Sequence, residues 1–418
     1  MALSGSTPNP DPIPALPTRS RAGLNAANFL QAEAVGVVLP VLNTFLREAG
    51  WRYDEIGIAT AVAGLGTLLF QTPAGSLVDR WHSRRALFAV SSLGVGLCFL
   101  LVPAVAGSHF WVDALLFLAG IVQSVFVPVL AALALALAGH RALNRVMGEN
   151  QGWNHAGNIA AALIAFFAVG RFGSASIFYA VAIASLVGAF SVFLIRKQDL
   201  DEARGSGDHG ASSTTWQTLL KDRAILFLLL AVGAFHLANA PILPVTALYI
   251  QHLGGSDRLT TFTVLSAQMV MVPMAWITGR LCDSWGRKPI LAVAFWVLPA
   301  RILSYTLAHN PSMVVVLQAL DGIGAGIYSV AIVAFAADLT QGKGRFNTLL
   351  GIFATAQGIG GVAGPILSGA ILQHLGFRDT FLAFAALALA AAILFQSTVS
   401  ETAQTRPRLR PARSGEAH

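Results

Sequence analysis

Two stretches of the chain follow one pattern: GSLVDRWHSRR at residues 75–85 and GRLCDSWGRKP at residues 279–289. Each contains a glycine, an aspartate, a tryptophan and a group of basic residues in the same order. Because each stretch lies between two long apolar runs, it predicts a polar turn between two membrane-spanning helices. A separation of 204 positions relates Gly75 to Gly279, Asp79 to Asp283 and Trp81 to Trp285.

The correspondence extends along most of the chain. The same separation of 204 relates Pro40 to Pro244, Gly50 to Gly254 and Gly120 to Gly324. A separation of 203 then relates Asn144 to Asn347, Gly148 to Gly351, Gly157 to Gly360 and Gly173 to Gly376. The sequence therefore predicts two parallel repeats. Such repeats are a recurring transporter design, in which the substrate site lies between the two halves.

Composition restricts the class of protein. Of the 418 residues 55% are hydrophobic and only 11% are charged, with a mean hydropathy of +0.66. A soluble domain carries about 25% charged residues, so these values indicate a membrane protein. Cys98 and Cys282 have no metal-ligand spacing around them, and we expect no metal and no cofactor.

The apolar runs predict an all-α membrane protein with twelve spans, six in each repeat. An N-terminal bundle at 23–195 and a C-terminal bundle at 224–398 are joined by a charged linker at 196–223, with a disordered tail at 1–22 and a second tail at 399–418. The predicted spans are 23–46, 55–78, 86–106, 111–138, 146–170, 174–195, 224–251, 259–281, 289–308, 313–337, 347–371 and 378–398.

The distribution of basic residues predicts the orientation. With both termini inside, the inner loops and tails hold 21 of the 27 Lys and Arg residues and the outer loops hold 5, while Arg301 lies within a span. This bias predicts a multi-pass protein of the inner membrane with cytoplasmic termini. It also accounts for the sequence pI of 9.9 through contacts with the lipid bilayer rather than with nucleic acid.

The repeated stretch is a candidate gate. Its aspartate can accept hydrogen bonds from the N-terminus of a neighbouring helix, and its basic residues can pair with acidic helix ends. Such contacts would hold the cytoplasmic side closed. Asp338 is a candidate partner for Arg280 or Arg287. The predicted gate residues are Gly75, Asp79, Arg80, Arg84, Arg85, Gly279, Asp283, Arg287, Lys288 and Asp338.

With these residues the chain resembles the major facilitator superfamily, whose loop signature is roughly Gly-x-Leu-Ala-Asp-Arg-x-Gly-Arg-Arg. The first copy departs from that signature at His82 and Ser83. The resemblance covers about residues 22–400 and implies alternating access by a secondary transporter, which we expect to act as a monomer. It does not identify the substrate, because this fold serves many. Relative to proton-antiporting drug exporters, the fourth span has Gln123 and no arginine, and GIGGVAGPILSG (358–369) lies in the eleventh span rather than the fifth.

Polar residues inside the spans are candidates for the substrate cavity, since such groups are costly in lipid. Three asparagines recur every four residues in the fifth span, and His236 and Asn239 share a face of the seventh. In the superfamily these helices contribute to the central cavity. The candidates are Gln31, Gln123, Asn150, Asn154, His155, Asn158, His236, Asn239, Gln268 and Gln357.

Three charged residues lie well inside the spans, about eight residues or more from the nearer end. Arg301 and Asp321 are at comparable depth in adjacent helices, which predicts a structural charge pair, because the ninth span is peripheral in the superfamily. Glu33 lies about ten residues from the inner end of the first span, roughly 15 Å deep at ~1.5 Å per residue. A carboxyl group at that depth predicts a residue that exchanges protons and couples their movement to transport.

We expect no enzymatic activity, because the chain has no Walker phosphate loop, GxSxG elbow or HExxH pair. The principal hypothesis is proton-coupled transport of a small, partly apolar organic solute, by export or uptake. The alternatives are transport of a metal chelate or organic anion, and a sensor that binds a ligand without moving it.

Overall fold

The computed structural model describes residues 16–36, 42, 45–51, 53–206, 216–255 and 257–402, and within these ranges the chain is helical and contains no β-strand. The first half comprises α1 (Thr18–Gly36), α3 (Tyr53–Arg80), α4 (Arg84–Leu101), α5 (His109–Gln123), α6 (Phe126–Phe172) and α7 (Ser176–Ser191). The second comprises α9 (Arg223–Asn239), α10 (Ile242–His252), α11 (Asp257–Trp285), α12 (Arg287–Tyr305), α13 (Pro311–Thr340) and α14 (Phe346–Thr398). The linker carries three short helices: η3 (Lys197–Asp199), η4 (Arg204–Ser206) and α8 (Trp216–Leu219).

Two of these helices contain a sharp break and therefore belong to two spans each. Gly139 interrupts α6 with a φ of 63°, and Gly376 interrupts α14 with a φ of 81°. Backbone angles in this left-handed region favour glycine. The fourth span consists of α5 and the part of α6 before Gly139, and the seventh consists of α9 and α10 on either side of Pro241. Counted this way, the helices agree with the twelve predicted spans. The first helix begins at Thr18, before the predicted boundary at residue 23.

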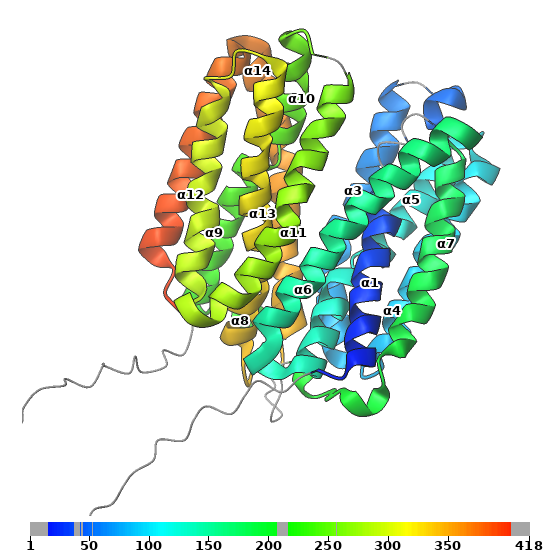
Figure 1. The fold of residues 1–418 in the computed structure, drawn as a ribbon, viewed down its shortest axis with the longest axis vertical. Coiled ribbons are helices and arrows are strands. Elements are labelled where there is room, and N and C mark those ends of the chain that lie inside the picture. Colours follow the sequence, from blue (N-terminus) through cyan, green and yellow to red (C-terminus); the bar gives the residue numbers. More distant parts are fainter. Residues whose placement is uncertain are drawn as a thin grey trace, which may run out of the picture.

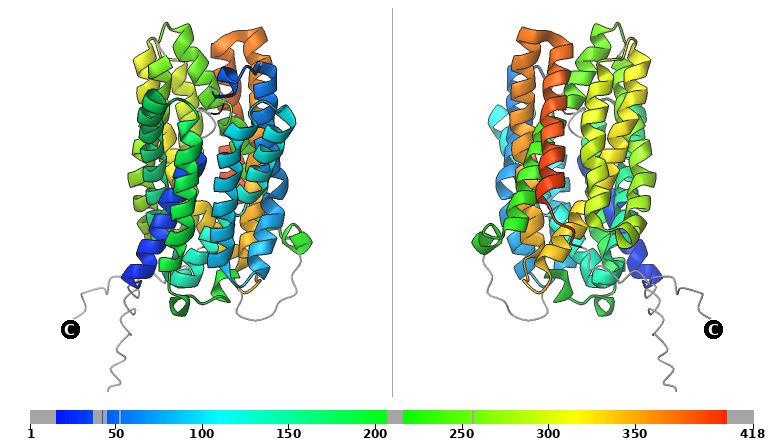
Figure 2. Two further views of the ribbon diagram at one scale, coloured as in Figure 1. Left: turned by 90° about the vertical axis from the view of Figure 1, so that its right-hand side faces the viewer. Right: turned by 90° about the vertical axis from the view of Figure 1, so that its left-hand side faces the viewer.

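The two halves pack their helices in the same way. The first span packs on the fifth (α1 on α6), the second on the fourth (α3 on α5) and the third on the sixth (α4 on α7). The second half repeats this arrangement with α9 on α14, α11 on α13 and α12 on α14. Figure 1 shows the two bundles side by side, and in the turned views of Figure 2 one bundle lies in front of the other. The predicted two-repeat architecture is confirmed.

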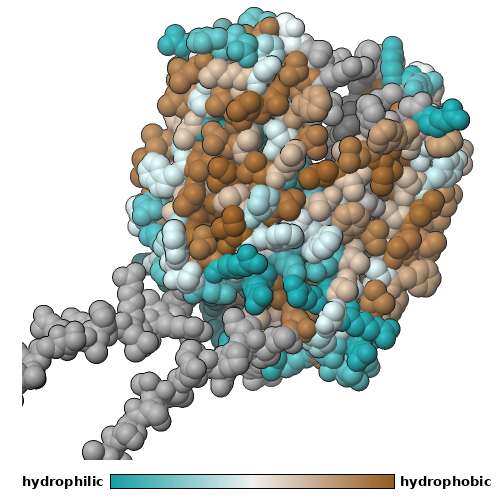
Figure 3. Space-filling model, in the orientation of Figure 1, coloured by the Kyte–Doolittle hydropathy of each residue, from teal (hydrophilic) through white to brown (hydrophobic). Residues whose placement is uncertain are grey.

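The outer surface fits a lipid environment. Among the described residues, nine helical stretches are long and apolar enough to cross a membrane, and two of them contain the breaks at Gly139 and Gly376. Large apolar side chains such as Val90, Phe167 and Ile366 are more than two-thirds exposed. Figure 3 shows apolar residues over the middle of one face and hydrophilic residues toward its two ends. This distribution is that of a protein embedded in a bilayer.

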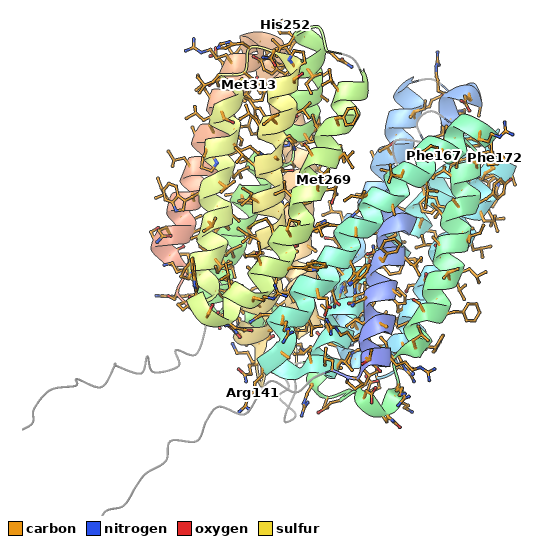
Figure 4. All side chains as sticks on the ribbon, viewed as in Figure 1. Arg141, Phe167, Phe172, His252, Met269 and Met313 are labelled. Atoms are coloured by element: carbon orange, nitrogen blue, oxygen red, sulfur yellow. The ribbon has the colours of Figure 1, made fainter. Side chains whose placement is uncertain are left out.

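The halves meet chiefly through two helix pairs, α3 with α14 and α6 with α11. These contacts gather toward one end of the molecule, where the α3–α4 and α11–α12 turns and the linker lie. We call it the basic end. Figure 4 shows Arg141 at this end, and His252 and Met313 at the opposite, far end. The bundles come together at the basic end and diverge toward the far end (Figure 1).

Candidate functional site

The first copy of the repeated stretch is joined to the other half of the molecule. Asp79, at the end of α3, accepts hydrogen bonds from the backbone N–H groups of Asn347 and Thr348, at 3.1 and 2.7 Å. It also accepts from the Asn347 Nδ2 and Thr348 Oγ1 atoms, at 2.8 and 2.6 Å. These donors form the first turn of α14, where backbone N–H groups have no partner within the helix. The carboxylate therefore caps a helix of the opposite half.

The second copy makes the reciprocal contact. Asp283 in α11 accepts a hydrogen bond of 2.6 Å from Nδ2 of Asn144 in α6. Asn144 and Asn347 correspond in the repeat, so each half donates an asparagine to the aspartate of the other. Gly279 allows the close approach, because a Cβ there would lie 2.6 Å from the carbonyl oxygen of Asn144. Gly75 has the same role against Asn347.

The linker contributes to the contact between Asp79 and the start of α14. Nη1 of Arg84, a residue only 2% exposed, forms an ion pair of 2.7 Å with Glu202. The carbonyl oxygen of Gly205 accepts a hydrogen bond of 2.9 Å from Asn347. Sequence reasoning did not find Glu202, because nothing in a charged linker marks which acidic residue folds back.

The C-terminal segment contacts the second copy in a comparable way. Arg287 pairs with Asp338 of α13 at 2.9 Å, which decides between the two predicted partners, Arg280 and Arg287. Thr402 donates to the same carboxylate at 3.0 Å. Glu401 accepts from the backbone N–H groups of Arg287 and Lys288, both at 3.0 Å, and so caps α12.

The remaining predicted gate residues lie around these contacts. Arg85 donates to the carbonyl oxygen of Ile195 at 2.7 Å, and Lys288 donates from Nζ to that of Gln396 at 2.9 Å. Arg80 is exposed at the end of α3. The structure therefore brings most of the predicted gate residues to the basic end, where they join helices of one half or of both.

A cavity of about 530 Å³ lies between the halves, walled chiefly by the second. Six of the predicted cavity residues line it: His155, Asn158, His236, Asn239, Gln268 and Gln357. Nδ1 of His155 is 2.9 Å from Oε1 of Gln268, so one polar contact crosses from α6 to α11 inside the cavity. The apolar wall includes Phe235 and Tyr328, whose rings stack with centroids 5.6 Å apart.

Four predicted cavity residues do not line this cavity: Gln31, Gln123, Asn150 and Asn154. Asn154 donates to Oε1 of Gln31 at 3.0 Å, which joins α6 to α1 inside the first bundle. Gln123 ends α5, and Asn150 is 1% exposed. These residues lie within the first bundle, away from the cavity. A stripe of polar residues in the sequence is compatible with either role, a contact between helices or a cavity wall.

Arg301 and Asp321 form the expected ion pair, from α12 to α13. The structure adds that both residues line the cavity. The prediction of a purely structural pair rested on a peripheral position for this helix, but the long arginine side chain reaches inward from it. Nη2 of Arg301 also donates to Oδ1 of Asn239 at 2.6 Å.

The side chain of Glu33 lies outside the described part of the chain. The structure therefore gives only the helical backbone of α1 at that position. Sequence reasoning missed Tyr328 and Gln151 in the cavity wall. A tyrosine within a predicted span was an available signal, because a buried hydroxyl group needs a polar partner or a ligand.

Comparisons with known proteins agree with this arrangement. The family model of the major facilitator superfamily matches residues 24–298 and 290–418. An uncharacterized MFS-type transporter of Mycobacterium tuberculosis is 35% identical over 96% of this chain and 99% of its own length. The multi-drug resistance efflux pump PmrA of Streptococcus pneumoniae is 24% identical over 88% of this chain and 92% of its own.

Solved structures share the fold. The human organic anion transporter MFSD10 superposes with a TM-score of 0.75 and 14% identity, covering 91% of this chain and 100% of that one. The Escherichia coli fucose:proton symporter FucP gives a TM-score of 0.74 at 14% identity, covering 91% and 98%. With its two six-helix repeats, reciprocal aspartate contacts and central cavity, the chain belongs to the major facilitator superfamily and is a multi-pass membrane transporter rather than an enzyme.

Proposed function

We infer that this transporter moves a small, partly apolar organic solute through the cavity between its halves, coupled to protons. The observation that carries this proposal is the composition of the wall. Aromatic and aliphatic side chains predominate, with a few amides, two histidines and one ion pair among them. Such a wall suits a ligand with an apolar body and a few hydrogen-bonding groups. A second candidate is an organic anion, which Arg301 on the wall favours.

The two states of the cycle follow from the contacts at the basic end. Asp79 and Asp283 hold the halves together there, so in the described state the basic end is closed. In the proposed cycle the halves rock apart at the basic end and both contacts break. The cavity is then exposed to the side of the membrane that the basic end faces. The basic end is the cytoplasmic end in this proposal, as the bias of Lys and Arg indicates.

Proton coupling is assigned to Glu33. Its support is the sequence: it is an acidic residue deep in the first span, whose helix packs on α6 beside the cavity. A cavity open to each side in turn would let this carboxyl group exchange protons with either compartment.

The proposal is tested with purified protein in liposomes. A panel of amphiphilic cations, carboxylates and metal complexes is first screened for an increase in melting temperature, and each hit is then tested for counterflow and for accumulation driven by an imposed pH gradient. Counterflow without pH-driven accumulation contradicts the coupling alone. Binding without counterflow identifies a sensor and refutes transport.

The orientation has its own test. Cysteine introduced at Ser206 in the linker should resist an impermeant thiol reagent in intact cells and react in inverted vesicles. The native Cys98 and Cys282 are buried and give little background. Labelling in intact cells would place the basic end outside and refute the orientation.

A further inference from the structure

The ion pair of α12 and α13 stands at the surface of the cavity rather than in the packed interior. Nη1 of Arg301 pairs with Oδ1 of Asp321, and both residues line the wall. Gln318 donates to the other carboxylate oxygen at 3.2 Å, and its own amide oxygen accepts from Tyr305 at 2.5 Å. The pair is therefore oriented from behind by a buried chain of hydrogen bonds, while its front meets the space where a ligand would bind.

The polar groups at this wall have unused bonding capacity. Arg301 is 2% exposed, yet its Nε atom has no hydrogen-bond partner among the described residues. The same holds for Nε2 of His236 and Nε2 of His155, on residues that are 7% and 8% exposed and line the same cavity. Buried polar atoms nearly always have a partner in the protein or in water, so three nitrogen atoms without a protein partner around one cavity leave bonding positions that a polar ligand can take.

The arrangement selects the chemistry of that ligand. A guanidinium group presents five N–H donors in a planar fork that fits a carboxylate through two parallel bonds. Asp321 reaches only Nη1 of this fork, and Nη2 is used by Asn239, so no acceptor spans the fork. Phe235, Tyr328 and Phe353 supply apolar surface to the wall of the same cavity. A carboxylate on an apolar body fits both parts.

We propose that Arg301 and Asp321 form a carboxylate-binding site, in which Asp321 occupies the place of the ligand's carboxylate when the cavity is empty. The incoming carboxylate takes over Arg301, and Asp321 takes up one proton from the solution that fills the cavity. Before binding, the positive charge of Arg301 is paired with the carboxylate of Asp321. After binding, it is paired with the carboxylate of the ligand and Asp321 is neutral, so no unpaired charge is buried at either stage. The inference rests on the proposed function, since it treats this cavity as the substrate site.

Binding should consequently consume one proton for each carboxylate. The other titratable groups that face the pair or the cavity are Tyr305 of α12, Tyr328 of α13, His236 of α9 and His155 of α6, while the lining residues of α11 and α14 are not titratable. Only Asp321 carries a negative charge to be neutralised, so its replacement by asparagine should abolish the proton uptake.

The first experiment is chemical rescue with purified full-length protein in detergent. Asp321→Ala leaves Arg301 without its carboxylate and should lower the melting temperature by several degrees. Acetate should restore much of that loss, whereas acetamide and chloride at equal concentration should not. The double variant with Arg301→Ala should not respond to acetate. Absence of acetate rescue in Asp321→Ala would show that a carboxylate does not reach Arg301 and would overturn the proposal.

The second experiment measures the proton. Benzoate and benzamide have the same shape and differ in charge. Benzoate binding to the wild-type protein, titrated calorimetrically in two buffers of different ionisation enthalpy, should take up about one proton, and Asp321→Asn should bind benzoate about tenfold more tightly with no uptake. Asp379→Asn, an exposed substitution at the far end, is the control and should behave as wild type. Benzamide binding as tight as benzoate, or unchanged proton uptake in Asp321→Asn, would refute the site.

These outcomes are independent of transport, because both measurements are made in detergent. Carboxylate binding without movement across liposomes would contradict the proposed function and leave the site standing. Transport of neutral solutes without carboxylate binding would refute the carboxylate site and leave the proposed function standing.

Discussion

Replacing Asp79 by asparagine should shift the transporter toward states that are open at the basic end. The carboxylate accepts four hydrogen bonds from the first turn of α14, two on each oxygen. An asparagine keeps one acceptor oxygen and loses the charge. Hydrogen bonds to a charged group contribute about 1.5–3 kcal/mol each, and water replaces part of that in the open state, so the loss of two bonds costs about 3 kcal/mol.

The structure makes this loss specific to one conformation. Asp79 and its donors belong to different halves, so the bonds exist only while the basic end is closed. About 3 kcal/mol corresponds to roughly a hundredfold change in the ratio of closed to open molecules, at 1.4 kcal/mol for each factor of ten. The fold within each half keeps its contacts. Transport should therefore fall much more than abundance in the membrane, and the same direction is expected for Asp283→Asn.

The assay is a distance measurement between spin labels on the two halves. Labels at Arg141 and Gln341, both exposed at the basic end, report its opening in a background where Cys98 and Cys282 are replaced by alanine. The Asp79→Asn protein should gain a population at longer distance. Asp379→Asn, with the same chemical change at the far end, should not. Unchanged distance distributions together with wild-type transport in Asp79→Asn would refute the assignment of the gate.

Three further predictions concern other parts of the molecule. Arg301→Ala should destabilise the protein by up to about 3–5 kcal/mol, since it leaves the partly buried carboxylate of Asp321 without its partner, and adding Asp321→Ala should recover part of the lost melting temperature; simple addition of the two effects would show that the residues do not interact. Glu33→Gln should abolish accumulation driven by a pH gradient while exchange of substrate persists, so accumulation at the wild-type rate would disprove coupling through this residue. Gly152→Ala should lower the melting temperature by an amount equivalent to about 1–3 kcal/mol, because its Cβ would overlap the indole of Trp276. Trp276→Ala should relieve that loss, and a melting temperature unaffected by either change would show that the two helices are not in contact there.

The repeat was the part of the fold that the sequence predicted best. Corresponding glycines have the same local role in both halves: Gly50 and Gly254 have φ angles of 92° and 82°, and Gly173 and Gly376 have 82° and 81°. A glycine whose backbone angles exclude other residues is visible in sequence as an identity at a turn. The spans were equally visible, because the bilayer imposes about 20 apolar residues on each helix.

The sequence predicted the repeated residues of the gate but not the acidic residues of the linker and the C-terminal segment that contact them. The repeated aspartates and asparagines could be matched by position, and their preference for helix ends follows from the charge at a helix N-terminus. Glu202 and Glu401 were not found, because each lies in a polar segment with more than one acidic residue, and the sequence does not show which of them folds back onto a helix. Only the path of the chain after each half brings them to Arg84 and to the start of α12.

The cavity shows most clearly what could not be predicted from the sequence. The sequence by itself determined which residues are polar at membrane depth, and its apolar runs, basic loops and internal repeat determined the architecture and the family. The side that each polar residue faces was decided by tertiary structure. Asn154 turns toward α1 and binds Gln31, whereas Asn158, one helical turn further, faces the cavity. Both positions suit an amide equally well, because a hydrogen bond to a neighbouring helix and one to a ligand satisfy the same group, and only the packing of the two bundles determines which is available.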